Sequence, residues 1–344
     1  MSSYPRLKAG VQLLHTEPFI GSFIGLQTHG VQFTDSQLAA IARAFDGSHR
    51  ITEIAAALRL DPYEVTEVAS ALLSAGLLEF SATPQRRQSV STTHGEVGNS
   101  FRADQQKLEL DLITHREGRT DGGAGELEAR SRYTILISGE NRLARTLLAL
   151  LQSMGIVHSR IITRGQVALH ITPHDLCTMT TRMSDVGKLR NDFHKEIIRE
   201  SALPNGESVA KAAPDLIIST VPIEWDYVQR WMSEGTNYIH ISQVIGAHLE
   251  IGPLVIPGKS ACLRCVALTK RDARLPTAVE AIRGELTSAT IARVAGLVSA
   301  LVAEFIETGT SPLLGASIWL DLLKPLEQPE RRYWAHHGEC GCTN

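Results

Sequence analysis

A strand-length apolar run that leads directly into a turn and an amphipathic helix lies in the middle of the chain. This stretch, YTILISGENRLARTLLALLQSMG at residues 133–155, has one glycine at the turn and apolar residues at helical spacing after it. The run PDLIIST at residues 214–220 is continuously apolar, as in strands that are buried on both faces of a parallel sheet. Because such strands alternate with longer helices from about residue 131 onward, we predict an α/β domain with a largely parallel sheet over residues 131–344.

The first 82 residues show a different pattern. The stretch GLQTHGVQFT is typical of a short hairpin, and three amphipathic helices and the strand-like run LLEF follow it. We therefore predict an α+β winged-helix domain over residues 1–82. The next stretch, SATPQRRQSVSTTHGEVGNS, has almost no large apolar residue. We predict a linker over residues 83–130, with one polar helix in SFRADQQKLELDLITHREG and a flexible end in RTDGGAGELEAR.

The composition excludes several classes of protein. The 344 residues are 43% hydrophobic and 21% charged, and the net charge is −3, whereas a protein that binds nucleic acid without regard to sequence normally has a basic excess. The N-terminus has no apolar core of the kind found in signal peptides, and no uncharged apolar stretch is long enough for a membrane span. We predict a cytosolic protein whose thiols are reduced.

Four of the five cysteines form two close pairs. Cys262 and Cys265 lie in ACLRCVAL, and Cys340 and Cys342 lie in GECGCTN near the C-terminus. Two short knuckles that each offer two thiolates are typical of a structural zinc site, which is closed to water and substrate. We predict that these four cysteines bind zinc; the alternatives are core cysteines without a metal, or a redox Cys-x-x-Cys pair. Cys177 stands alone and is expected to be a packed or surface residue.

The order of these features resembles the family of ubiquitin-activating and thiamine-biosynthesis (ThiF-type) adenylyltransferases. The resemblance covers residues 131–344 and rests on the strand-turn-helix at residues 133–154, the run PDLIISTVPIEWDYVQRWMSEGTNYIHIS, the segment GPLVIPGKSACLRC and the second cysteine pair. It implies a Rossmann-like fold, and it implies that the two cysteine pairs hold a structural zinc, with His336 and His337 as less favoured ligands.

Three elements that this family uses for ATP are missing. The turn keeps Gly139, but Asn141 and Ala144 stand where the other two glycines are expected, and Arg142 lies between them. Thr163 and Arg164 follow the second strand in place of an acidic residue. Ser219 to Pro222 stand where a magnesium-binding aspartate is expected, and Asp215 lies at the opposite end of that strand. We predict that this chain does not bind ATP, and that Arg142 and Arg145 serve surface or partner contacts.

Residues 1–82 resemble the PqqD-like domain that recognises ribosomally made, modified peptides. The hairpin, the run LAAIARAFDGSHRITEIAAAL and the run EVTEVASALLSAGLLEF carry this resemblance. It implies that a leader peptide pairs with an exposed strand edge and places apolar side chains in a groove beside the third helix. The predicted edge residues are Ile24, Gly25, Leu26, Gln27 and Val31. The predicted groove residues are Val65, Val68, Ala69 and Leu72, unless these side chains simply form the core of the domain.

Together, the two resemblances point to the "ocin-ThiF" family of leader-peptide-binding partner proteins of azoline-forming cyclodehydratases. This family implies that the chain binds a precursor peptide and presents its core to a separate YcaO-type enzyme, which forms thiazoline or oxazoline rings. It also implies a homodimer, with the long apolar helix at residues 287–308 as a candidate surface. Two alternatives stay open: an adenylyltransferase that activates a peptide carboxylate, and a winged-helix transcriptional regulator, although the third helix has three acidic residues and no basic one.

Overall fold

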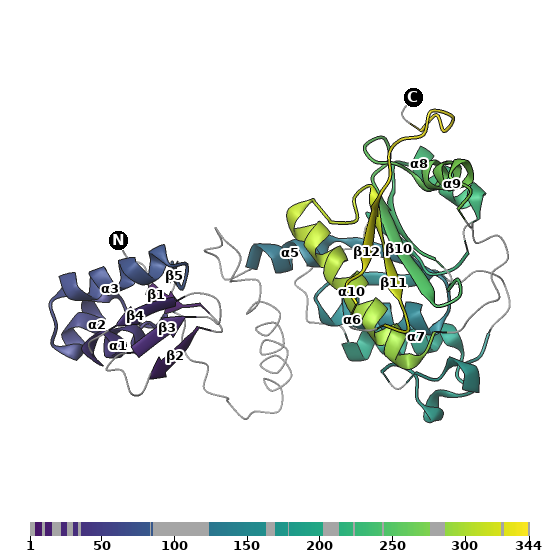
Figure 1. The fold of residues 1–344 in the computed structure, drawn as a ribbon. Coiled ribbons are helices and arrows are strands. Elements are labelled where there is room, and N and C mark those ends of the chain that lie inside the picture. Colours follow the sequence, from purple (N-terminus) through teal and green to yellow (C-terminus); the bar gives the residue numbers. More distant parts are fainter. Residues whose placement is uncertain are drawn as a thin grey trace. The chain divides into compact units, whose positions relative to one another are not determined.

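The computed structural model of the chain describes residues 4–8, 11–15, 22–25, 30–33, 36–82, 84, 124–162, 169–177, 179–201, 213–222, 224–242, 244–275, 286–324 and 327–342. The chain divides into two compact units, Met1–Glu128 and Ala129–Asn344, which are treated separately below (Figure 1). The polar helix predicted in the linker lies outside the described residues.

The N-terminal unit has two small antiparallel sheets. Strands β2 (Gln12–His15), β3 (Ser22–Gly25) and β4 (Gly30–Phe33) form one sheet in the order β2-β3-β4, so β3 has a partner on each side. The other sheet joins β1 (Tyr4–Leu7) to the returning strand β5 (Leu78–Ser81). The predicted hairpin and returning strand are therefore both present.

Three helices pack against these sheets: α1 (Ser36–Arg43), α2 (Ile51–Leu58) and α3 (Pro62–Ser74). Helix α3 begins as expected for its sequence, because the Asp61 carboxylate accepts a hydrogen bond from the Tyr63 backbone N–H and Pro62 occupies the first turn. The apolar stripe of α3 faces inward. The core of the unit contains Ile24, Ile41, Phe45, Ile54, Val65, Val68, Ala69, Leu72 and Leu77.

The C-terminal unit contains a seven-stranded sheet in the order β12-β11-β10-β9-β8-β6-β7. The four strands β6 (Thr134–Ser138), β7 (His158–Ile162), β8 (Leu216–Ser219) and β9 (Asn237–Ile241) are parallel. The other three, β10 (His248–Val255), β11 (Ala316–Asp321) and β12 (Glu330–Tyr333), are antiparallel. The sheet is thus mixed, and the prediction of a largely parallel sheet holds only for its first four strands.

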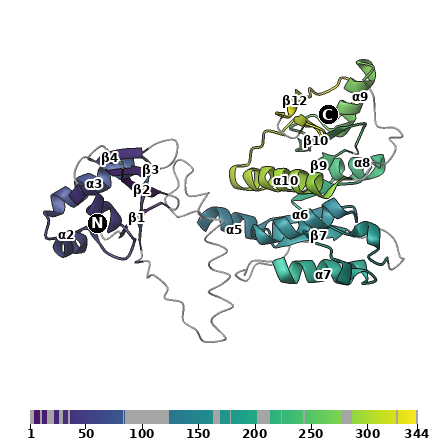
Figure 2. The ribbon, with the colours of Figure 1, turned by 60° about the horizontal axis from the view of Figure 1, so that its bottom comes forward.

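Helices cover both faces of this sheet. Because side chains of successive strand residues point to opposite faces, one strand contributes residues to two hydrophobic cores. Leu216 and Ile218 belong to one core with α6 (Arg142–Ser153), α7 (Arg190–Ser201) and α10 (Ser288–Thr308), and Figure 2 shows α6 lying between the other two. Ile217 points to the other core, with α8 (Trp225–Ser233) and α9 (Leu263–Asp272). By length and composition alone, α10 is the one helix of the described residues that can cross a membrane, but its buried side belongs to the sheet core.

Residues 124–132 form a helix, α5 (Ala124–Arg132), where the sequence predicted a flexible end of the linker. The Arg130 guanidinium explains the difference. It donates to the Glu307 carboxylate at 2.6 Å and to the Met154 carbonyl oxygen at 2.9 Å, and the Arg130–Glu307 pair is buried. This buried ion pair joins the last turn of α5 to α10 within the C-terminal unit.

Gly139 follows β6 with a φ of +129°, and a Cβ atom there would overlap the Thr220 hydroxyl oxygen and lie 2.8 Å from the Val221 side chain. We expect Gly139→Ala to lower the free energy of unfolding by roughly 2–4 kcal/mol through strain and overlap. Gly296→Ala is the control, because Gly296 is an exposed helical glycine of α10 with open space around it, and alanine there should change stability by less than about 1 kcal/mol. Urea unfolding followed by tryptophan fluorescence measures both; equal losses would contradict the packing argument.

Candidate functional site

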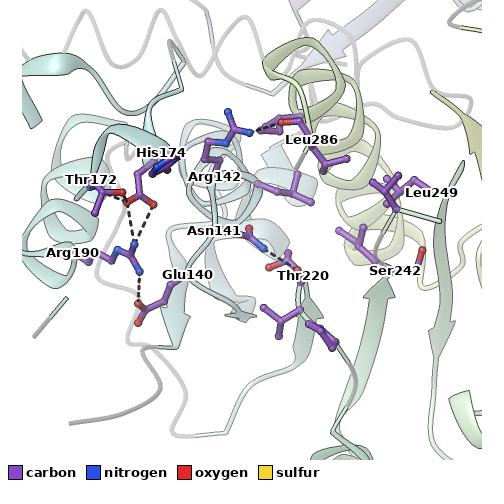
Figure 3. A pocket seen from close by; sticks show the side chains of 17 residues that line it. Glu140, Asn141, Arg142, Thr172, His174, Arg190, Thr220, Ser242, Leu249 and Leu286 are labelled. Carbon is purple, nitrogen blue, oxygen red and sulfur yellow. Dashed lines mark hydrogen bonds and ion pairs between the residues drawn. The ribbon is translucent and has the colours of Figure 1, made fainter. Parts of the chain in front are cut away.

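A cavity of about 590 Å³ lies at the carboxyl ends of β6, β8 and β9, where open α/β sheets bind their ligands (Figure 3). One part of its wall is polar and comes from the turn after β6, the segment around residues 172–175 and the start of α7. The other part is apolar and comes from the ends of β8 and β9, β10 and α10. The polar part contains Glu140, Asn141, Arg142, Thr172, His174, Asp175 and Arg190, and the apolar part contains Val221, Pro222, Ile241, Val244, Leu249, Leu286 and Ile291.

The N-terminus of α6 is capped by the side chain of Asn141. Its Oδ1 accepts from the Ala144 backbone N–H at 2.9 Å, and its Nδ2 donates to the Thr220 carbonyl oxygen at 2.9 Å. A helix N-terminus binds phosphate through its unpaired N–H groups, and here the cap occupies one of them. Gly139 is needed for the close approach of Thr220 rather than for access of a ligand to the backbone.

Four buried or half-buried charges form a cluster at the polar wall, where Glu140, Asp175 and Arg190 line the cavity and Arg145 lies beneath them. The Asp175 carboxylate accepts from Arg145 Nη2 at 2.7 Å and from Arg190 Nη2 at 3.0 Å, and Arg190 Nη1 lies 3.5 Å from Glu140 Oε2. The two carboxylates and two guanidinium groups balance one another. Arg145 was predicted to serve surface or partner contacts; this is wrong, because its side chain is 0% exposed and must pair inside the protein.

The environment of this cluster shifts several pKa values. Burial opposes ionisation of Asp175, but hydrogen bonds from Thr172 and Arg145 outweigh it and lower the pKa to about 2. Burial, helped by the charges of Arg145 and Arg190, lowers the pKa of His194 to about 4, so this imidazole is neutral at pH 7. Glu140 Oε1, Arg145 Nε and Arg190 Nε are buried without a hydrogen-bond partner. The cluster is therefore balanced in charge but not fully satisfied in hydrogen bonds.

The remaining cation of this wall, Arg142, donates to two backbone carbonyl oxygens, that of Leu286 at 2.5 Å and that of Leu176 at 3.4 Å. A nucleoside triphosphate needs N–H groups and cations directed at its phosphates. In the described part of this wall, one helical N–H is capped, Arg190 is held by two carboxylates and Arg142 is held by two carbonyl groups. These residues do not fit a triphosphate.

The structure also shows Ser219 and Asp215, the two residues of β8 and its start that were considered in place of a magnesium-binding aspartate. Ser219 ends β8 with its hydroxyl directed at the Val221 carbonyl oxygen, 3.3 Å away. Asp215 precedes β8 and accepts from the Thr134 backbone N–H at 2.9 Å, at the amino end of the sheet and away from the cavity. Thr163 and Arg164 lie outside the described residues.

The four paired cysteines come together on the face of the sheet that α8 and α9 cover. Their sulfur atoms all lie within 4.8 Å of one another, with Cys262 Sγ 3.4 Å from Cys340 Sγ and Cys265 Sγ 3.4 Å from Cys342 Sγ. A tetrahedral site with Zn–S bonds of about 2.3 Å separates its sulfur atoms by about 3.8 Å, which this cluster matches closely. The backbone N–H of His337 donates to Cys265 Sγ at 3.4 Å. The four thiols can thus hold a metal ion with zinc geometry and leave no open position.

In the N-terminal unit, the predicted peptide-binding residues divide into four groups. Ile24 and Gly25 lie in β3, which already has a partner on each side and cannot accept another strand. Val31 lies in the edge strand β4, whereas Leu26 and Gln27 lie outside the described residues. The four predicted groove residues on α3 are at most 4% exposed and belong to the core.

A cavity of about 250 Å³ does lie between α1 and α3, but its lining differs from the predicted one. Val68 is the only predicted residue in it. The other lining residues are Gln37, Leu38, Ile41, Tyr63, Glu64 and Glu67. Tyr63 is 69% exposed, and Glu64 and Glu67 have no ion-pair partner among the described residues.

Sequence reasoning missed Glu140, Asp175 and Arg190. Asp175 has a local signal, because Thr172 and Asp175 form a capping pair around the short 3-10 helix Pro173–Asp175. Its pairing with Arg145 and Arg190, 30 and 15 residues away, has no such signal.

No protein-family model matches the sequence, and no curated protein matches it. Solved structures do share the fold. The microcin C7 biosynthetic enzyme MccB in complex with N-formylated MccA is 13% identical with a TM-score of 0.62, and 99% of each chain is covered. E. coli MccB with ATP is 14% identical with a TM-score of 0.62 and 99% coverage of both chains. A heterocyclase in complex with substrate and cofactor is 12% identical with a TM-score of 0.56, and the match covers all of this chain but 40% of that one. These likenesses show that the chain shares its fold with MccB.

We expect Asp175→Asn to destabilise the C-terminal unit by about 3 kcal/mol or more, because it leaves the buried Arg145 guanidinium without a counter-charge. Asp192→Asn is the matched control. It removes an exposed carboxylate that pairs with Lys195 at 3.0 Å, and such pairs contribute less than about 1 kcal/mol. Urea unfolding at pH 7 measures both, and a loss of under about 1 kcal/mol for Asp175→Asn would contradict the importance of this pair.

We expect the purified protein to contain one zinc ion per chain, measured by elemental mass spectrometry. Cys340→Ser should abolish zinc retention and lower the thermal unfolding temperature, because a structural metal site contributes directly to folding. Cys177→Ala is the control, since this cysteine is buried elsewhere, beside Thr146. Zinc retention in Cys340→Ser, or its loss in Cys177→Ala, would contradict the assignment.

Proposed function

We propose that this chain is a non-catalytic partner of a YcaO-type cyclodehydratase in the cytosol. It binds the leader segment of a ribosomally made precursor peptide and presents the core of that peptide for thiazoline or oxazoline formation. Its zinc is structural, and the exposed side of α10 is the surface of a homodimer.

The observation that carries the non-catalytic role is the neutralised wall of the 590 Å³ cavity. An adenylating enzyme must stabilise negative charge that moves over a triphosphate, and it needs cations directed at that charge. In this chain Asp175 and Glu140 hold Arg190, and Arg145 is buried against Asp175. Moving Arg190 toward a phosphate would leave Glu140 without its cation.

The groove between α1 and α3 supports the recognition role. Its floor is apolar, with Leu38, Ile41 and Val68, and its rim has an exposed tyrosine and two carboxylates without ion-pair partners among the described residues. Such a groove suits a peptide that inserts an apolar side chain and offers hydrogen-bond donors to the rim. Helix α1 directly follows the edge strand β4, which offers backbone groups for strand addition next to the groove.

The match to the heterocyclase covers all of this chain and 40% of that one. We propose that the ring-forming chemistry belongs to a second protein.

Adenylation of a peptide carboxylate is the second candidate. The match to MccB with ATP over 99% of both chains favours it. The chain would then have to bind ATP at the cavity beside Gly139, where Arg190 is held by two carboxylates and Arg142 by two carbonyl groups.

Binding of a fluorescently labelled leader, taken from the precursor peptide that the proposed function requires in the same organism, tests the proposal. We expect Tyr63→Ala to weaken binding at least about tenfold, because an exposed aromatic residue on a groove rim is a typical anchor. Leu73→Ala is the matched control: it lies on the same helix, is 44% exposed and does not line the groove.

Pyrophosphate exchange into ATP, measured with the same protein and the full precursor, separates the two candidates. We expect no exchange above a blank. Exchange that Arg142→Ala abolishes would overturn the non-catalytic role and leave recognition in place. Absence of leader binding by the wild-type chain would overturn recognition itself.

A further inference from the structure

One loop of the C-terminal unit holds an unusual share of the exposed apolar side chains. Of the twelve large apolar residues that are exposed in the described part of the chain, five lie in the segment 169–189, here named the 169–189 loop. Met183 is 72% exposed and Met179 is 46% exposed. The other three are Leu169, Val186 and Leu189. Apolar side chains concentrated in this way on a surface mark interaction sites.

This loop is closed by its own backbone. Ile171 donates to the Lys188 carbonyl oxygen, Gly187 donates to the Ile171 carbonyl oxygen, and Arg190 donates to the Leu169 carbonyl oxygen, each at 2.9 Å. At the tip, the Thr181 N–H donates to the Cys177 carbonyl oxygen at 2.7 Å. The described residues of the loop are therefore held by backbone hydrogen bonds before a partner binds, so ordering them on binding costs little entropy.

The acidic groups of the loop point inward, whereas its basic groups do not. Asp175 is buried in the charge cluster, and Asp185 accepts from the Arg182 backbone N–H at 2.7 Å and from Lys188 Nζ at 2.8 Å. Arg182 is exposed, and His170 and His174 are exposed too. The outer surface of the loop therefore combines apolar side chains with the Arg182 cation, and none of its described residues is an exposed carboxylate.

We propose that the 169–189 loop is the docking surface for the separate cyclodehydratase, which receives it in an apolar recess with an acidic rim. This inference rests on the proposed function, because it names the surface through which the second protein is held. Methionine and arginine are enriched in the cores of protein interfaces, and both stand on this loop. Unbranched methionine side chains also adapt to the shape of a partner.

A second copy of this chain fits the loop less well. In a symmetric dimer the same patch meets itself, which would bring two Arg182 cations together with no exposed carboxylate of the loop to separate them. A partner with acidic groups around an apolar recess satisfies both properties of the surface.

The test uses the full-length chain and the purified YcaO-type cyclodehydratase that the proposed function requires in the same organism, with the dissociation constant of the pair measured by calorimetry. We expect the double variant Met179→Asp/Met183→Asp to weaken the pair at least about tenfold, and Arg182→Glu to weaken it in the same direction. The control double variant is Leu323→Asp/Tyr333→Asp, which changes two residues of the same unit that are 79% and 71% exposed. It should bind as the wild type does. All of these residues are exposed, so folding should not change, and thermal unfolding checks this.

Each outcome bears on one proposal or the other. Equal affinity of the loop variants and the wild type would overturn the docking surface while leaving leader recognition intact, since leader binding is measured separately. Equal weakening by the control variant would also overturn it. If the wild-type chain binds the leader but not the cyclodehydratase, the docking surface falls and recognition stands. If sedimentation shows that the loop variants instead break a homodimer, the loop contacts a second copy and the inference is wrong.

Discussion

The buried guanidinium of Arg145 is the constraint on which much of the C-terminal unit depends. It lies in the first turns of α6 with 0% of its side chain exposed, and removing such a charge from water costs several kcal/mol unless a counter-charge is close. Asp175 supplies this counter-charge, and its carboxylate also accepts a hydrogen bond from the Thr172 hydroxyl group. The same carboxylate holds Arg190 at the start of α7. One ion pair thus orders the cavity wall and anchors the loop that carries the exposed methionines.

A second set of contacts holds the C-terminal segment. Beyond the cysteine cluster, Trp334 Nε1 donates to Ser317 Oγ at 2.8 Å, and Ser317 Oγ donates to Glu250 at 2.6 Å. The other oxygen of Glu250 accepts from Lys270 of α9, which follows Cys265 on the same helix. The segment that carries Cys340 and Cys342 is therefore fastened both at the thiols and at Trp334. These contacts tie the helix of the first cysteine pair to the antiparallel strands β10 and β11.

The sequence predicts the parts of the fold that depend on local periodicity. The strands β6 and β8, the helix α6 and the cysteine pairs all follow from spacing, and the Asp61 cap follows from residue type. The antiparallel part of the sheet was not predicted, because an apolar run in the sequence does not show whether its strand lies parallel or antiparallel to its neighbours. Arg145 was placed at the surface because its counter-charge is 30 residues away. Gly139 and Asn141 were identified as turn residues, but the reason, contact with Thr220, required the neighbouring strand.

The N-terminal unit shows why groove residues are hard to identify from a helical pattern. Helix α3 has 13 residues and one apolar stripe. Because a unit this small needs the whole stripe for its core, Val65, Ala69 and Leu72 are buried there. Only Val68 also reaches the groove. On the proposed function, the residues that contact the peptide stand at the border of the stripe: Tyr63, Glu64 and Glu67. A peptide that fills the apolar floor would then meet two exposed carboxylates at the rim, so cationic groups beside its apolar side chain would favour binding.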